Sequence, residues 1–303
     1  MFKKLMITFL VIFLCPSIAN AMHTPAKISY IAIPVTTPEK NWQVSGQLRM
    51  PFNATENTPA VIILHSSAGV DSTGMFYASA LNRRGIATLE LDLWGARDLA
   101  GGSANRPATP QETLPDVFSA LAYLAEHSLI DKDRIGVMGF SWGGVLSLLT
   151  ASENYMSLTG QPYRFAGHIA HYPICWLYNY APGFEFTNFT GAPILIQTGA
   201  KDDYDLPETC PNLVASLPEE EQEFVKVKVY KRAYHAWDRL EPKWIVEDPF
   251  SHLGQGGQVT LAPNFITAYQ SKYRVEKFFS ELFGLTRSRQ NNDSVDINGD
   301  IGN

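Results

Sequence analysis

Residues 139–144 read Gly-Phe-Ser-Trp-Gly-Gly, and this segment restricts the fold more than any other part of the chain. It follows the apolar run 135–138 and precedes a helical pattern at 145–149. A serine between glycines at such a junction is typical of a nucleophile elbow, a sharp turn that lifts a hydroxyl out of a sheet. Glycines are needed there because side chains would collide with neighbouring backbone. The alternative is an ordinary glycine-rich turn, so the rest of the chain has to decide.

Apolar runs and helical patterns alternate along most of the chain. Short continuous apolar runs are typical of strands buried on both faces, whereas the first two runs alternate apolar with polar residues, as an antiparallel edge does. Strands are predicted at 29–35, 42–50, 60–65, 86–92, 135–140, 165–172, 193–198 and 225–230. Helices are predicted at 74–84, 111–127, 142–151, 207–217 and 263–283. This order predicts one α/β domain with a mostly parallel sheet of about eight strands flanked by helices.

Residues 1–21 have the composition of a secretory signal peptide. Lys3 and Lys4 precede an apolar stretch at 5–14, and small residues at 19–21 offer a cleavage site. The apolar stretch is too short to span a membrane. A lipoprotein signal at Cys15 is disfavoured by the bulky leucine before it. We therefore expect an exported protein, periplasmic or secreted.

Composition narrows the range of partners. Because two lysines leave with the signal peptide, the formal net charge changes from −6 to −8. A mildly acidic chain without basic clusters argues against nucleic acid or anionic lipid as a partner. No later segment is apolar and long enough to anchor the chain in a membrane. The remainder divides into a folded domain at 22–286 and a polar, patternless tail at 287–303, which we expect to be disordered.

Export also makes the cysteines informative. The mature chain keeps Cys175 and Cys210, and two cysteines in an oxidising compartment favour pairing. Cys175 follows one predicted strand, and Cys210 follows the loop after the next. Neighbouring strands lie about 5 Å apart, close to the Cα separation of a disulfide. We predict a Cys175–Cys210 bridge; the alternative is two separate buried thiols.

A serine nucleophile needs a base, and the base needs an acid that fixes its tautomer. The strand at 193–198 runs into Gly-Ala-Lys-Asp-Asp at 199–203, which places a carboxylate at the same sheet edge as the elbow. Asp202 is the preferred acid, with Asp203 and Asp205 as alternatives. The three aspartates could also form no more than a solvated turn.

The base is predicted from its place after the last strand. His235 lies in Tyr-His-Ala-Trp at 234–237, shortly after the strand at 225–230, where it can reach back over Ser141. The other mature histidines end earlier strands, follow a helix or lie in loops. The order nucleophile, acid, base outweighs the interpretation of His235 as a packed or surface residue.

Developing negative charge on the substrate oxygen also requires donors. The backbone N–H of Trp142, directly after the nucleophile, is one candidate. The other is predicted in the loop that follows the third strand, at residues 65–69, where the Ser67 N–H is preferred and the Ser66 N–H is the alternative.

Together these segments resemble the dienelactone hydrolase family of the α/β-hydrolase superfamily. The elbow, Gly-Ala-Lys-Asp at 199–202 and Tyr-His-Ala-Trp at 234–237 are similar to its three motifs, and the loop ending at Asp71 is similar to its oxyanion loop. The resemblance runs from about Ala60 to Gly284 and implies an α/β-hydrolase fold. Dienelactone hydrolases proper use a cysteine nucleophile and a glutamate in the oxyanion loop. This chain has Ser141 and Ser66 instead, which suits a serine esterase.

The resemblance also implies a substrate-binding role for two arginines. Arg97 and Arg239 lie close to where the family carries arginines for a substrate carboxylate. Two convergent guanidinium groups would favour an ester or lactone with a free acid group. The alternative is that both are surface arginines paired with Asp98 and Asp238.

Two segments fit this scheme less directly. Residues 174–192 carry six aromatic residues with little periodicity, and either wall a ligand site or form a satellite hydrophobic cluster. Residues 240–259 end in a glycine-rich stretch without the Lys-Ser or Lys-Thr of a phosphate loop, so a flexible surface loop is expected.

The sequence therefore predicts an exported serine hydrolase that cleaves a small-molecule carboxylic ester or lactone through a Ser141 acyl-enzyme. His235 acts as base and then acid, and Asp202 orients it. No metal or organic cofactor is expected, because water completes the cycle. The alternatives are a peptidase of the same fold and a non-catalytic binding protein on a hydrolase scaffold.

Overall fold

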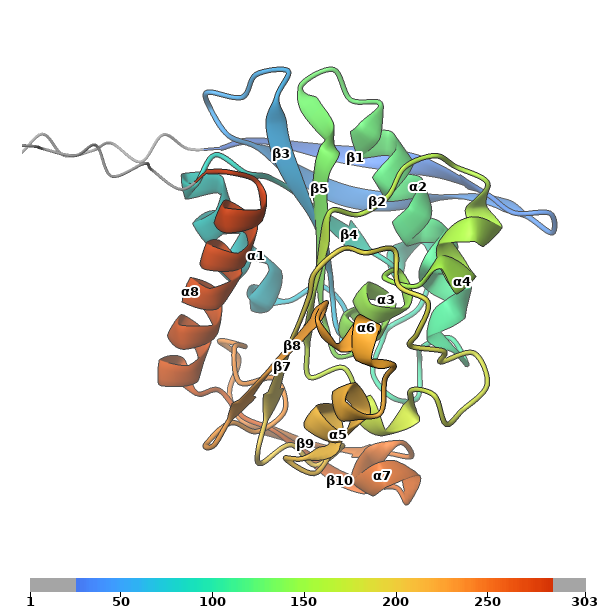
Figure 1. Cartoon of the computed structure of the whole chain (residues 1–303), viewed down its shortest axis with the longest axis vertical. Helices are drawn as coiled ribbons and strands as arrows, with labels where there is room; N and C mark the ends of the chain where they lie inside the picture. Colours follow the sequence, from blue (N-terminus) through green and yellow to red (C-terminus); the bar gives the residue numbers. More distant parts are fainter. Residues whose placement is uncertain (1–25, 286–303) are drawn as a thin grey trace, which may run out of the picture.

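A sheet of eight strands forms the centre of the molecule (Figure 1). The computed structural model describes residues 26–285, so the predicted signal peptide at 1–21 and tail at 287–303 lie outside it. The strands are β1 (Lys27–Thr36), β2 (Asn41–Met50), β3 (Thr58–Leu64), β4 (Ala87–Asp92), β5 (Ile130–Phe140), β6 (Gly167–His171), β7 (Ile194–Gly199) and β8 (Val225–Tyr230). Their spatial order is β1-β2-β4-β3-β5-β6-β7-β8, and only the pairings made by β2 are antiparallel. All eight predicted strands, and the antiparallel edge, are confirmed.

Helices cover both faces of the sheet, as predicted. Figure 1 shows α1 and α8 on one face and α2 and α3 on the other. The helices are α1 (Ser72–Arg83), α2 (Leu114–Ala125), α3 (Trp142–Leu149), α4 (Glu153–Met156), α5 (Thr209–Ala215), α6 (Glu219–Gln222), α7 (Ser251–Gly254) and α8 (Phe265–Leu282). Within residues 26–285, no helix is both long and apolar enough to cross a membrane.

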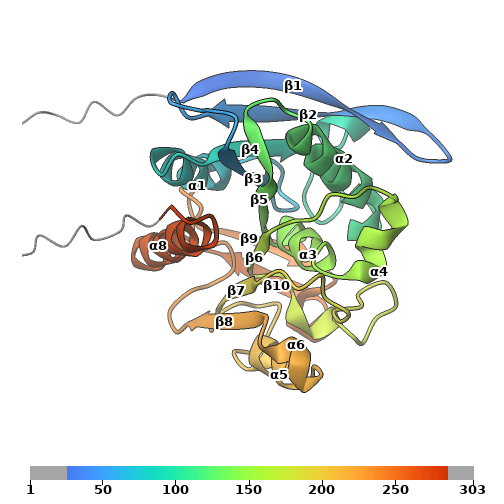
Figure 2. The same cartoon turned by 45° about the horizontal axis from the view of Figure 1, so that its top comes forward.

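Strand β3 shows why the sheet is buried on both sides. Its residues are all buried, and successive side chains point to opposite faces. Ile62 and Leu64 join the hydrophobic cluster under α2 and α3, whereas Val61 and Ile63 join the cluster under α1 and α8. The antiparallel β1–β2 hairpin lies at the far edge of the sheet (Figure 2). This frame brings the carboxyl ends of β3 to β8 to one edge, where the predicted functional residues follow.

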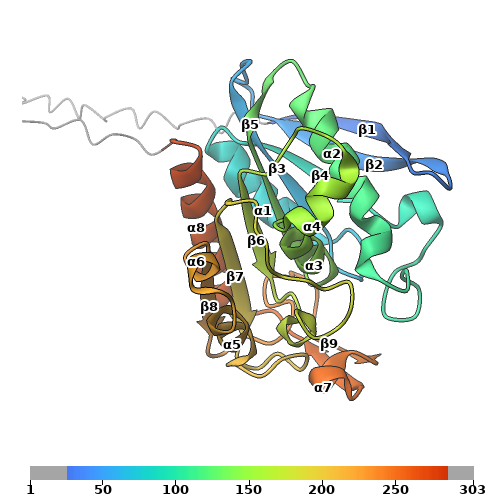
Figure 3. The same cartoon turned by 45° about the vertical axis from the view of Figure 1, so that its right-hand side comes forward.

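The segment 240–259 is a hairpin rather than the expected loop. It contains β9 (Trp244–Asp248), which pairs antiparallel with β10 (Gly257–Leu261), and α7 lies in the connection. Figure 3 shows this unit beyond the ends of the central strands. Gly254, Gly256 and Gly257 have φ values of 83°, 78° and 133°, which side chains rarely tolerate. The glycines therefore serve a defined turn between two strands.

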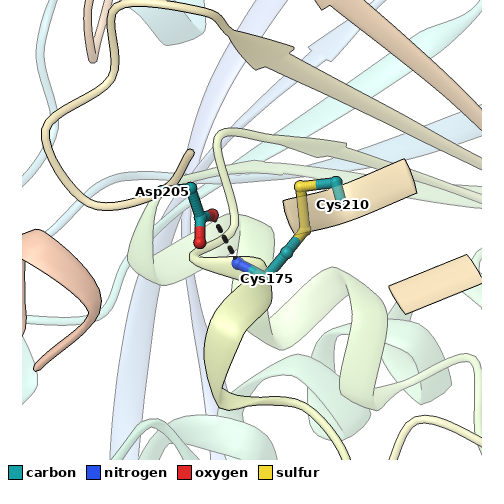
Figure 4. A group of neighbouring side chains, drawn as sticks. All are labelled: Cys175, Asp205 and Cys210. Atoms are coloured by element: carbon teal, nitrogen blue, oxygen red, sulfur yellow. Dashed lines mark hydrogen bonds between the residues drawn. A yellow bond between two sulfur atoms is a disulfide. The ribbon is translucent and has the colours of Figure 1, made fainter. Parts of the chain in front are cut away.

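A disulfide joins Cys175 and Cys210, with a Cα–Cα distance of 5.1 Å, as predicted (Figure 4). Cys175 follows β6 and Cys210 lies in α5. Within residues 26–285, these cysteines and Asp205 form the one cluster of three potential metal ligands, with donor atoms within 4.8 Å of one another. Because both sulfurs are used in the disulfide, the oxidised protein offers no thiolate there.

Most aromatic residues of the segment 174–192 pack inside the protein, whereas Tyr180 is exposed. Tyr178 and Phe186 are buried in the main hydrophobic cluster, and Phe184 and Phe189 pack against it. Trp176 packs against a smaller cluster that includes Val259 of β10. No residue of 174–192 lines the cavity near Ser141, and the aromatic side chains pack mainly on the main hydrophobic cluster, so neither interpretation holds in full.

The buried His168 of β6 makes a prediction about stability. Burial lowers its pKa to about 3, and its Nε2 has no hydrogen-bond partner in the described part of the chain. Below pH 6.5 this histidine is protonated in the unfolded state but not in the folded state. The free energy of unfolding therefore decreases as the pH is lowered. Between pH 7.5 and 5.0, wild type should lose about 2 kcal/mol more unfolding free energy than His168→Gln in chemical denaturation. Equal losses would contradict a neutral His168.

Candidate active site

Ser141 stands at the predicted elbow between β5 and α3. Its φ of 50° and ψ of −108° lie outside the regions that side chains prefer. A Cβ on Gly139 would overlap the backbone of Gly143, and one on Gly143 would overlap the carbonyl of Leu64. The turn is therefore possible only with glycines at both positions. The close approach holds α3 against β3 and β5 and raises the serine to the sheet edge.

His235 and Asp202 meet at the same edge. The carboxylate Oδ2 of Asp202 accepts a hydrogen bond of 2.8 Å from Nδ1 of His235, and both side chains are almost fully buried. The rings of Tyr172 and Tyr204 each lie 4.6 Å from the imidazole, centroid to centroid. The carboxylate holds Nδ1 and the two rings hold the plane of the imidazole, so Nε2 is the ring nitrogen left for other partners.

The two alternative acids have other partners. Asp203 Oδ2 accepts a 2.7 Å hydrogen bond from the Thr260 N–H of β10. Asp205 accepts a 2.6 Å hydrogen bond from the backbone N–H of Cys175 (Figure 4). It also accepts one of 3.1 Å from the backbone N–H of Trp176. Burial, helped by the charge of Asp202, raises the pKa of Asp205 to about 7. Each of the three aspartates thus has a separate task, and only Asp202 bonds to His235.

A cavity of about 150 Å³ contains Ser141 and His235 in its lining. The oxyanion loop contributes Ser66, Ser67 and Ala68, and the hairpin contributes side chains from both β9 and β10. Among the residues that the structure describes, the Ser141 hydroxyl has no hydrogen bond to His235. Such bonds are often long in unliganded sites and shorten when substrate binds.

The loop at residues 65–69, predicted to be the oxyanion loop, is held by a buried histidine. Nδ1 of His65 donates to the Ser66 carbonyl at 2.6 Å, and Nε2 accepts from the Leu93 N–H at 2.9 Å. Burial lowers the pKa of His65, which favours the neutral ring that this pattern needs. The Ser66 carbonyl also accepts from the Gly69 N–H at 3.0 Å. Because a trans peptide directs C=O and N–H to opposite sides, these bonds also orient the Ser67 N–H.

The next peptide is held as well. The Ser67 carbonyl accepts hydrogen bonds from the Trp94 indole at 3.1 Å and from the Gly102 N–H at 2.6 Å. Within residues 26–285, neither the Ser67 N–H nor the Trp142 N–H bonds to another protein group. The side chain of Ser66 stabilises the loop itself, because its Oγ accepts a hydrogen bond of 3.2 Å from the Ala68 N–H.

Comparison with known proteins gives the family. The model of the dienelactone hydrolase family matches residues 44–252, more than half of the chain. The chain belongs to the dienelactone hydrolase family. It is therefore a hydrolase, and the resemblance noted in its motifs is confirmed.

Individual relatives agree with this assignment. A probable 2-oxo-3-(5-oxofuran-2-ylidene)propanoate lactonase from a Bradyrhizobium species is 25% identical over 207 residues, which is 64% of this chain and 80% of the relative. Est1E from Butyrivibrio proteoclasticus has a TM-score of 0.55 at 16% identity, covering 84% of this chain and 99% of its own. The dienelactone hydrolase-like promiscuous phosphotriesterase P91, from metagenomic libraries, has a TM-score of 0.58 at 17% identity, covering 84% and 98%. The two structural likenesses support the α/β-hydrolase fold.

Arg97 does not take the place expected for a carboxylate-binding arginine of this family. Its guanidinium forms a 2.7 Å ion pair with the buried Asp116 and donates to the carbonyls of Leu93 and Glu112. Arg97 does not line the cavity. Arg97 follows β4, as the sequence predicts, but its side chain points toward Asp116 of α2. The expected pair of convergent guanidinium groups is therefore not formed.

Arg239 does line the cavity, but two carboxylates already compensate its charge. Its Nε lies 2.9 Å from Asp71 and 3.5 Å from Glu241. Asp71 is also the N-cap of α1, where it accepts from the Thr73 N–H. Arg239 thus ties the end of the oxyanion loop to the segment that carries His235. The partners proposed from sequence, Asp98 and Asp238, are not the ones found; Asp238 accepts from Tyr77 and Tyr172.

Sequence reasoning missed the contribution of the hairpin. Trp244, Val246 and Asp248 of β9 and Leu261 of β10 line the cavity. Asp248 pairs with Arg106 at 3.1 Å, and the Arg106 guanidinium lies over the Trp142 ring. The available signal was the strand-like run at 244–248, rich in aromatic and β-branched residues.

Because Asp202 and Asp203 have different hydrogen-bond partners, we expect their substitution to affect the kinetics differently. Asp202→Asn should lower kcat on a simple ester by about 10³–10⁴-fold, because an amide favours the wrong tautomer of His235. Asp203→Asn should cost less than about tenfold, since its amide oxygen can still accept from Thr260. Steady-state kinetics of both folded variants tests this. A larger loss from Asp203→Asn would overturn the assignment of the acid.

Proposed function

We propose that this protein is a serine esterase or lactonase that cleaves a carboxylic ester through an acyl-enzyme on Ser141. The observation that carries the proposal is a single cavity lined by Ser141, His235 and the Ser67 loop, with His235 bonded to Asp202. These are the parts that acyl transfer to a serine requires: nucleophile, oriented base and donors for an oxyanion.

The geometry supports the following sequence of steps. Ser141 Oγ attacks the ester carbonyl carbon as His235 Nε2 takes its proton. The resulting oxyanion accepts hydrogen bonds from the N–H groups of Ser67 and Trp142. The intermediate collapses as His235 returns the proton to the leaving alcohol. Water then attacks the acyl-enzyme with the same proton transfers and releases the acid.

The size of the cavity favours a compact reacting group. In other proteins, an engineered apolar cavity of about 150 Å³ binds benzene. The cavity beside Ser141 has a similar volume, about 150 Å³. A short acyl chain or a single ring therefore fits beside Ser141, whereas a long chain has to extend through the mouth.

Export is part of the proposal. The segment 1–21 has the pattern of a signal peptide, and the Cys175–Cys210 disulfide agrees with an oxidising compartment such as the periplasm or the cell exterior.

Ser141→Ala tests the nucleophile. It should lower kcat on esters by more than about 10³-fold, because only binding and oxyanion stabilisation remain. A fluorophosphonate probe should label wild type and not the variant. An amide matched to the ester should be cleaved far more slowly by wild type. An unlabelled wild type would favour a binding protein, and equal amide cleavage would favour a peptidase.

Arg239→Gln tests the role of the remaining arginine. As a tie between Asp71 and the His235 segment, it should affect neutral and anionic esters alike, lowering kcat/KM for both by about tenfold as a charge-assisted hydrogen bond is lost. Initial rates on a monomethyl dicarboxylate and its dimethyl ester give the comparison. A selective loss on the anionic ester would instead restore the carboxylate-binding hypothesis.

A further inference from the structure

The β9–β10 hairpin presents one of its faces to the cavity. Side chains alternate along a strand, so residues 244, 246 and 248 share a face. Trp244, Val246 and Asp248 all line the cavity, and Leu261, the register partner of Trp244, lines it from β10.

This face is held in place on several sides. Asp203, next to the proposed acid, accepts from Thr260, and its carbonyl accepts from His252 at 2.7 Å. The Ala262 N–H donates to the His235 carbonyl at 3.2 Å. On the other side, Arg106 pairs with Asp248. The hairpin is thus bonded to the turn that carries Asp202 and to the segment that carries His235, and its face has a fixed position relative to Ser141.

Trp244 is the unusual member of the face. It remains 56% exposed, whereas Val259 on β10 is fully buried. An indole that lines a cavity and is still open to water offers a flat apolar surface that another ring can cover. The cavity has room for one ring beside it.

The charges around the cavity favour an uncharged group. Asp248 at the other end of the face is paired with Arg106, and Arg239 is paired with Asp71 and Glu241. These pairings compensate the charged side chains of the lining, Arg239 and Asp248. A ligand charge would therefore lose hydration without gaining a free counter-ion.

We propose that Trp244 is a specificity-determining residue, and that the preferred substrates are esters with an uncharged aromatic ring that packs on its indole. The inference rests on the proposed esterase function and adds the chemical class of the substrate. The ring belongs to the acyl or to the alcohol part of the ester, and the test separates these.

The experiment compares matched esters by titrating the acid released. Methyl benzoate against methyl acetate tests an acyl ring, and benzyl acetate against ethyl acetate tests an alcohol ring. Wild type should prefer the aromatic member of at least one pair. Trp244→Ala should lower kcat/KM for that member by about tenfold and change the aliphatic member less than about twofold, and Trp244→Phe should keep most of the preference.

Ile245→Ala is the matched control. Ile245 is the next residue of β9, is 48% exposed and does not line the cavity. It should leave the aromatic preference unchanged. No aromatic preference in wild type, an equal loss on all four esters in folded Trp244→Ala, or the same change in Ile245→Ala would overturn the proposal. Absence of activity on every ester, with no labelling of Ser141, would contradict the esterase function instead.

Discussion

The close backbone contact at the elbow is the constraint on which the rest of the site depends. Gly139, Gly143 and the Leu64 carbonyl meet where no side chain fits, so β5 turns into α3 within one residue. Ser141 bears the cost in its unfavourable φ of 50°. The same contact brings α3 to the end of β3, and the Gly143 N–H donates to the His65 carbonyl at 3.1 Å. Ser141 and the loop at residues 65–69 are thereby held close to each other by backbone contacts.

The turn after β7 connects several parts of the site through its aspartates. Three carboxylates within four residues reach in three directions: Asp202 to His235, Asp203 to β10, and Asp205 to the segment after β6. The Cys175–Cys210 disulfide also joins the segment after β6 to α5, the helix that follows this turn. The turn therefore joins His235, the cavity-lining hairpin and the segment after β6.

The sequence was sufficient to predict which residues lie together at the carboxyl ends of the strands. Parallel strands share one edge, so Ser141, Asp202 and His235 could be brought together without coordinates, and so could Cys175 and Cys210. It did not predict side-chain direction. Arg97 lies where expected after β4, but a buried carboxylate on α2, unrelated in sequence, attracts it away from the cavity. The hairpin was missed because its glycines suggested a loose loop, whereas β9 pairs with β10 and both strands also contact distant residues, Arg106 and Asp203.

The most direct test of the central claim is a crystal structure of the protein inactivated by an alkyl phosphonate. Its tetrahedral phosphorus resembles the intermediate of acyl transfer. We expect phosphorus bonded to Ser141 Oγ and a phosphoryl oxygen within about 2.7–3.1 Å of the backbone nitrogens of Ser67 and Trp142. We also expect His235 Nε2 within hydrogen-bonding distance of Ser141 Oγ or the remaining phosphonate oxygen. Phosphorus on another residue, or a phosphoryl oxygen directed away from both backbone nitrogens, would contradict the central claim.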